Sequence, residues 1–160
     1  MAALPRAHLA YFPADVTNVL VVASALLDAT STAGALRAMH AREALRIHVL
    51  AIEPRPTGYA RTFLGQVDVE GIQDARAHQH AQPLCDALDA AGIPFRMHVV
   101  AGGWLDSIEH HARELGCTLI VVGDNPHHWL RRLVLRHDRW RIGSFLRGQG
   151  LGCRVEAVSS

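Results

Sequence analysis

Polar residues at the ends of short apolar runs are the first candidates for chemistry in this chain. Ser24 and Asp124 each follow such a run, and Glu53 closes another. A carboxylate can act as a general base, and a glycine such as Gly123 lets backbone amides approach a phosphate. We assign no acid or base role to Glu53 or Asp124, because carboxylates at strand ends are commonly solvated or bonded to loop amides.

Composition excludes several enzyme classes. All 16 basic residues are arginines, so the chain has no P-loop lysine, no Schiff-base lysine and no lysine general base. Ser24, Ser107 and Ser144 do not lie in a G-x-S-x-G elbow, which argues against a hydrolytic triad. The formal net charge of +1 gives no global field toward nucleic acid or anionic lipid. Any electrostatic function is therefore local.

Histidines and cysteines are present, but their spacing does not favour a metal site. The close histidine pairs lack the helical i, i+4 ligand spacing and a nearby cysteine, so we expect solvated side chains at His78-x-His80, His110-His111 and His127-His128. The cysteines are odd in number and show no C-x-x-C motif. We expect reduced, buried thiols at Cys85, Cys117 and Cys153.

Strand and helix patterns alternate along the chain. Short β-branched runs are typical of strands covered on both faces, and they are separated by segments with helical spacing. The expected strands are 18–23, 46–53, 94–101, 118–123 and 154–158, and the expected helices are 33–45, 69–91 and 106–115. This order predicts one α/β domain with a doubly wound parallel sheet. Ligands of such sheets lie outside the carboxyl ends of the strands, where the strand order reverses.

Residues 1–17 form an expected N-terminal extension to a domain over 18–158. Prolines, an arginine and an aspartate interrupt the first 15 residues, so they do not read as a signal peptide. No other stretch reaches the roughly 18 apolar residues that span a bilayer. We therefore expect a cytoplasmic protein.

The segment 101–123, AGGWLDSIEHHARELGCTLIVVG, resembles the universal stress protein family. The family shares its order of Gly, Asp, Ile, Ala, Gly, apolar strand and Gly, and the resemblance extends over about 18–158. It implies an open five-stranded parallel sheet of the adenine nucleotide alpha hydrolase-like, Rossmann-like kind. It also implies a homodimer through the C-terminal strand.

The chain departs from the nucleotide-binding motifs of that family. Members that bind ATP carry an aspartate after the first strand, where this chain has Ser24. They also carry G-x2-G-x9-G-[ST] after the fourth strand; here Pro126 and Arg136 replace the second and third glycines. Proline removes a backbone donor and restricts the loop. A Gly-Ser pair occurs seven residues late, at 143–144.

An arginine- and tryptophan-rich insertion occupies about 126–142. On a helical wheel its tryptophans lie on one side, and on another side lie Arg132, Arg136 and Arg139. One interpretation is a lid whose tryptophans pack on the domain. Another is a helix that docks on a protein partner; we do not favour a membrane surface, and we do not expect binding to nucleic acid.

Two main hypotheses follow. The first is a cytoplasmic binding or regulatory module of the stress response, a dimer with a degenerate nucleotide pocket, no cofactor and no catalytic residues. The second is an ATP- or AMP-binding protein, with Mg²⁺ and weak ATP hydrolysis among its properties. Its candidate nucleotide-binding residues are Ser24, Ile47, Gly123, Asp124, Gly143 and Ser144. The arginines of the insertion would serve as contacts to a partner or an anion.

Overall fold

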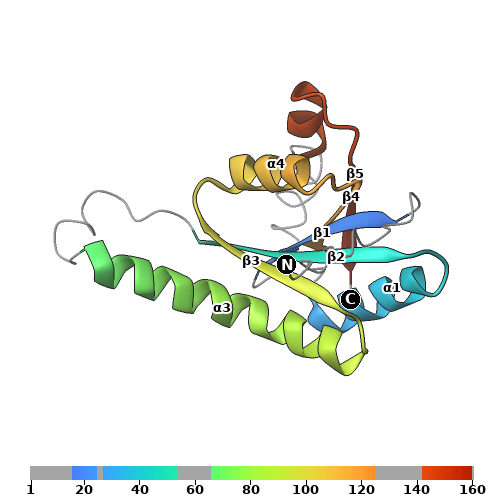
Figure 1. Ribbon diagram of the computed structural model, residues 1–160, viewed down its shortest axis with the longest axis horizontal. Coiled ribbons are helices and arrows are strands. Elements are labelled where there is room, and N and C mark those ends of the chain that lie inside the picture. The colour runs from blue at the N-terminus through green and yellow to red at the C-terminus, as the bar shows by residue number, and fades with distance from the viewer. Residues whose placement is uncertain (1–15, 25–26, 54–65, 125–141, 160) are drawn as a thin grey trace, which may run out of the picture.

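The computed structural model describes residues 16–24, 27–53, 66–124 and 142–159, and its centre is one sheet of five parallel strands (Figure 1). The strand order is β3-β2-β1-β4-β5. The bounds are β1 Thr17–Ala23, β2 Leu45–Glu53, β3 Phe95–Ala101, β4 Leu119–Asp124 and β5 Arg154–Ser159. The expected five-stranded, doubly wound α/β fold is confirmed, and each strand lies within one residue of its expected bounds.

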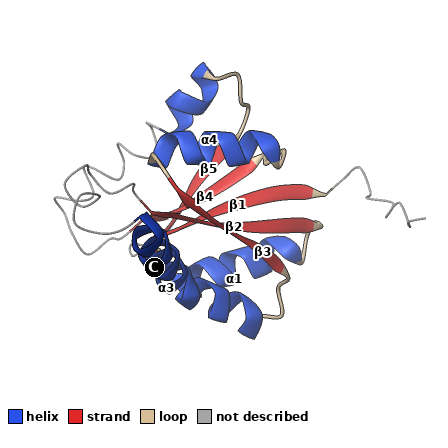
Figure 2. Cartoon of the chain, turned by 60° about the vertical axis from the view of Figure 1, so that its left-hand side comes forward, coloured by secondary structure: helices blue, strands red, loops and turns tan. Residues whose placement is uncertain are grey.

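Helices cover both faces of the sheet. On one side lie α1, Ala29–His40, and α3, Gln66–Ala90; on the other lies α4, Trp104–Glu114 (Figure 2). A short helix at 142–148 packs on the same face of the sheet as α4, because its Ile142 and Leu146 are buried in the same apolar cluster as Ile108 of α4. The strands thus separate two apolar cores, as expected for a sheet buried on both faces.

The central strand β1 contributes to both cores. Val19 and Val21 pack toward α1 and α3, whereas Leu20 and Val22 pack toward α4. All four side chains are at most 1 % exposed. A continuous apolar run is therefore required here, because successive strand residues point to opposite faces and neither face meets water.

The first helix begins earlier than the sequence predicts. Residues 33–45 were expected, with Ser31 or Thr32 as the cap, but α1 runs from Ala29 to His40 and its cap is Asp28. The Ser31 N–H donates to Asp28 Oδ1 at 2.6 Å, and this bond lowers the pKa of the carboxyl. Aspartate caps a helix as well as serine does, so the pattern of serine and threonine alone misplaced the start.

The direction of chain crossing changes between β1 and β4. From β1 the chain moves outward to β2 and β3, then returns across the sheet to pair β4 with the other side of β1. The carboxyl ends of β1 and β4 are therefore neighbours at the reversal of strand order. In doubly wound sheets this is where ligands bind.

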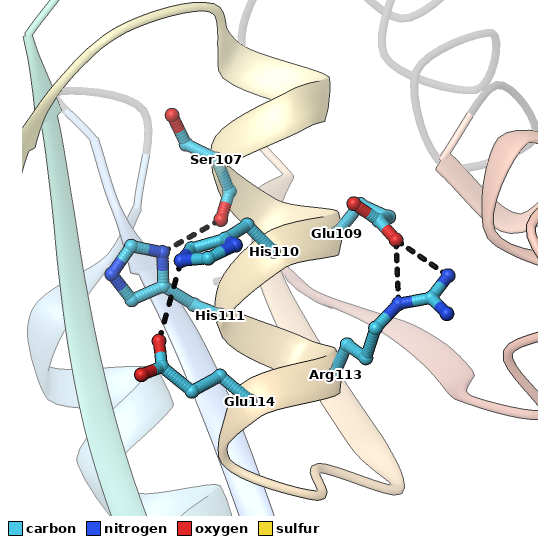
Figure 3. Close-up of polar contacts among 6 residues, drawn as sticks. All are labelled: Ser107, Glu109, His110, His111, Arg113 and Glu114. Carbon is cyan, nitrogen blue, oxygen red and sulfur yellow. Dashed lines mark hydrogen bonds and ion pairs between the residues drawn. The ribbon is translucent and has the colours of Figure 1, made fainter.

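Three histidines meet between the sheet and α4. His48 Nδ1 of β2 lies 3.1 Å from His98 Nε2 of β3, and the His98 ring contacts the edge of the His111 ring of α4. His111 donates from Nδ1 to the Ser107 carbonyl oxygen, while His110 turns away to Glu114 (Figure 3). The expectation of solvated histidines is therefore wrong for His111, which is half-buried.

The cysteines are free, as expected. Cys85 and Cys117 are buried and Cys153 is half-buried. Burial, together with a smaller effect of the nearby Cys153, raises the pKa of the Cys117 thiol to about 12. The Cys153 thiol donates to the Cys117 carbonyl oxygen at 2.9 Å, which joins the segments that precede β5 and β4.

Ile120→Ala tests the importance of the core beneath α4. Ile120 is fully buried in β4, so the change removes buried methylene and methyl groups and leaves a cavity. We expect the free energy of unfolding to fall by about 2–5 kcal/mol in urea denaturation. Leu105→Ala, at a half-buried position of α4, should cost clearly less. Equal losses for the two variants would contradict this assignment of the core.

The histidine cluster should make the fold sensitive to acid. Burial, reinforced by neighbouring positive groups, lowers the pKa of His48 and His98 from the ordinary value of 6.5. As pH falls, these histidines therefore take up protons in the unfolded chain before they do so in the folded chain. The free energy of unfolding should be highest above pH 6.5 and should decrease as the pH falls below that value. Melting temperatures from pH 8 to pH 5 should show this decline.

A matched pair of variants isolates the cluster. His98→Gln should flatten the decline, because it removes one titrating ring and the repulsion between His98 and His48. His40→Gln changes an exposed ring on α1 and should leave the profile as in the unmodified chain. Identical profiles for all three proteins would assign the acid sensitivity to other groups.

Candidate functional site

The reversal of strand order places Ser24 and Gly123 at the carboxyl ends of neighbouring strands. Ser24 directly follows β1 and is half-buried, and its carbonyl oxygen accepts the Leu27 N–H at 3.1 Å. Gly123 lies in β4, half-buried, where it pairs with β5. A hydroxyl and a backbone without a side chain therefore meet at the position where doubly wound sheets bind ligands.

A pocket of about 360 Å³ opens beside Ser24, between α1 and α3. Its polar groups come from Ser24, Gln79 and His80, and its apolar lining from Leu27, Ala29, Pro83 and Leu84. The volume lies near the lower end of the roughly 300–1,000 Å³ typical of small-molecule sites. The pocket can hold a small group with a few hydrogen bonds, such as part of a nucleotide.

Glu53 contacts His80, one of the residues that line the pocket. Glu53 is 7 % exposed, and its carboxylate Oε1 lies 3.2 Å from His80 Nδ1 of α3. Its backbone carbonyl oxygen accepts the Gly102 N–H at 3.0 Å, ahead of α4. A buried carboxylate requires such a partner. Glu53 therefore holds α3 against the end of β2 and is not a solvated strand-end carboxylate.

The structure brings together only some of the predicted site residues. Ser24, Gly123 and the backbone of Asp124 lie at the carboxyl edge of the central strands. Ile47 lies apart from them: it pairs with Val19 in the amino half of β2, is 1 % exposed and packs in the core. A buried side chain at the other end of the strand cannot line the same site.

The late Gly-Ser pair lies on the opposite face from the Ser24 pocket. Gly143 and Ser144 belong to the first turn of the helix at 142–148, which packs on the α4 side through Ile142 and Leu146. The pocket beside Ser24 lies on the side of α1 and α3. The two features can serve one ligand only if it crosses the sheet edge above β1 and β4.

The insertion at about 126–142 falls almost entirely outside the described residues. Arg132, Arg136 and Arg139 belong to that stretch, as does Pro126 of the broken motif. Their assignment as contacts to a partner or an anion stays a prediction.

His80 is a site residue that the sequence analysis missed. It was grouped with His78 as a solvated pair, and the ring is indeed half-exposed, but it pairs with Glu53 and lines the pocket. Helical spacing offered a signal: His80 lies three residues after Ala77 and four before Leu84, both of which are buried. That spacing places it at the margin of the buried face of α3.

Within the described residues, no group of three or more His, Cys, Asp or Glu side chains is arranged to hold a metal ion. Among the helices of residues 16–24, 27–53, 66–124 and 142–159, none has the length and apolar character to cross a membrane.

Comparison with known proteins relates the fold to a family. Residues 16–142 match the model of the universal stress protein family. Among curated proteins, none matches the chain in sequence.

Solved structures with the same fold include nucleotide complexes. A universal stress protein in complex with cAMP has a TM-score of 0.58 and 18 % identity, over 89 % of this chain and 96 % of that one. The universal stress protein from Archaeoglobus fulgidus in complex with dAMP has a TM-score of 0.56 and 14 % identity, over 89 % and 97 %. A family protein from Burkholderia pseudomallei has a TM-score of 0.53 and 22 % identity, over 90 % and 96 %.

Proposed function

The chain belongs to the universal stress protein family, and from that premise we propose that it is a cytoplasmic, nucleotide-responsive regulatory module and not an enzyme. The observation that carries the proposal is the place of Ser24 at the reversal of strand order, in the lining of a pocket, with Gly123 near the end of the neighbouring strand. Solved proteins of the same fold that hold cAMP and dAMP support an adenine nucleotide as the ligand. Neither a serine hydroxyl at the end of β1 nor a glycine at the end of β4 supplies an activated nucleophile.

The proposed nucleotide binding is weak because Ser24 stands where ATP-binding members carry an aspartate. A carboxylate can accept charge-assisted hydrogen bonds from both ribose hydroxyl groups, whereas a serine hydroxyl makes a neutral bond. Hydrogen bonds to charged groups are worth about 1.5–3 kcal/mol, so the loss of one weakens binding by roughly tenfold or more. The sequence departures at Pro126 and Arg136 add to this degeneracy.

Ser24→Asp tests the proposed pocket by gain of function. The new carboxylate restores the expected ribose contact, so AMP should bind at least about tenfold more tightly than to the unmodified chain in calorimetric titration. Thr30→Asp is the matched control, because it adds the same charge at an exposed position in the first turn of α1. It should leave AMP affinity nearly unchanged.

Protein for this titration must first be checked for nucleotide retained through purification. Titrations with ATP, with and without Mg²⁺, should give no phosphate release, in keeping with a regulatory role. If neither the unmodified chain nor Ser24→Asp binds AMP at millimolar concentration, the nucleotide proposal fails and the module acts through protein partners alone.

We further propose that the protein is a homodimer through β5. This strand lies at the edge of the sheet and pairs only with β4 among the described strands. Edge strands are sites where a further strand can be added, and a second copy of the chain can supply that strand. The alternating character of the C-terminal strand, with Val155 buried and Arg154 exposed, is compatible with such an edge.

Light scattering coupled to gel filtration should give twice the 17.5 kDa mass of one chain. Hydrogen exchange then distinguishes the two edges: amides of β5 should exchange more slowly than those of β3, since only β5 is covered in the proposed dimer. A monomer mass at all concentrations, or equal exchange at both edges, would refute dimerisation through β5.

A further inference from the structure

A second pocket, of about 680 Å³, opens at the opposite end of the sheet from Ser24. Arg46 and His48 of β2 and Arg96 of β3 line one wall, and Glu114 and Leu115 at the end of α4 line another. The volume is within the roughly 300–1,000 Å³ of small-molecule sites. The nucleotide proposal makes no use of this pocket.

Positive charge gathers on the strand side of this pocket. Arg96 is the register partner of His48 on the neighbouring strand, and Arg46 lies two residues before His48 on the same strand. All three residues are on the face that α4 covers, because alternate strand residues share a face. The two guanidinium groups help to lower the pKa of His48, after burial and His98, so their charge is felt at the ring.

His48 is the buried polar group of the pocket. It is 4 % exposed, and its Nδ1 lies 3.1 Å from His98 Nε2. In one neutral tautomer His98 donates to His48 Nδ1, which leaves a hydrogen on His48 Nε2. In that tautomer, the pocket combines two fixed positive charges with a buried imidazole donor.

We propose that this pocket binds a small organic anion, with its oxyanion group between Arg46 and Arg96 and its apolar part against Pro94 and Leu115. Arginine presents a planar fork of donors that suits a carboxylate or a phosphoryl group. The apolar lining, which also includes Val16, offers contacts to the remainder of the ligand.

Glu114 determines where in the pocket the anion lies. Its carboxylate is on the α4 wall, 64 % exposed and 3.3 Å from His110 Nε2 (Figure 3). The negative end of the α4 dipole lies at the same wall. Both features repel an anion from the helix and leave the arginine side as its place.

The test uses phenyl phosphate and benzoate as probes, followed by side-chain nuclear magnetic resonance of the histidines. Saturable shifts of the His48 and His98 ring signals are expected, with no comparable shift at His80, which reports the pocket beside Ser24. The stronger of the two probes identifies the oxyanion as phosphoryl or carboxylate. Inorganic phosphate, which lacks the apolar part, should bind more weakly than phenyl phosphate.

Three variants distinguish a specific anion-binding site from nonspecific electrostatic attraction. Arg96→Gln, at an exposed position, should weaken binding about tenfold, the effect of losing one charge-assisted contact. Glu114→Gln removes the repelling charge and should strengthen binding. Arg37→Gln, an exposed change on α1 at the other face, should have no effect.

Acid should strengthen the binding of benzoate, whose carboxylate stays ionised between pH 8 and pH 6. A bound anion favours the imidazolium form of His48, so affinity should rise as pH falls from 8 to 6, and the anion should raise the His48 pKa. The groups that face His48 are His98, Arg46 and Arg96, with His111 and Glu114 above on α4. Glu114→Gln should preserve this pH dependence.

The proposal is overturned if the His48 and His98 signals do not shift saturably with either probe. It is equally overturned if Arg96→Gln binds as tightly as the unmodified chain, or if Glu114→Gln weakens binding. The variants are surface changes, and an unchanged backbone spectrum confirms that each one is folded.

Discussion

The burial of β1 on both faces is the constraint from which the rest of the structure follows. Its side chains Val19–Val22 are at most 1 % exposed, and its backbone pairs with β2 on one side and β4 on the other. A strand enclosed in this way carries a polar side chain along its length only where a partner satisfies it, because a buried polar group without a partner is costly. The buried part of β1 carries none, and the two pockets described above open at the two ends of the sheet.

Much of the fold could be predicted because burial on both faces dictates which residue types a strand can contain. A strand with two buried faces must be a short apolar run, and the runs at 18–23, 46–53 and 118–123 identified three such strands within one residue. The start of α1 could not be placed equally well. Asp28, Ser31 and Thr32 are all competent caps, and the choice among them depends on which side chains must reach the core, where Thr32 is fully buried.

The site was less predictable because it depends on which strands are neighbours. Ser24 and Gly123 follow from their places at strand ends, but the contact of His80 with Glu53 requires the packing of α3 on β2. His48 and His98 are 50 positions apart, and only the pairing of β2 with β3 brings their rings together. The prediction for Ile47 is wrong for the same reason. An apolar side chain suits a contact to adenosine, but Ile47 pairs with Val19 near the other end of the strand.

The pairing of β1 with β4 also has a consequence for how the chain folds. Val19 pairs with Leu119, so the centre of the sheet joins segments 100 positions apart, while β1–β2 and β2–β3 join nearer ones. Closing so long a loop costs chain entropy before the contact repays it, which is typical of slow folding. Until β4 arrives, the most apolar strand has an open edge, and the newly made chain is most prone to aggregate during that interval.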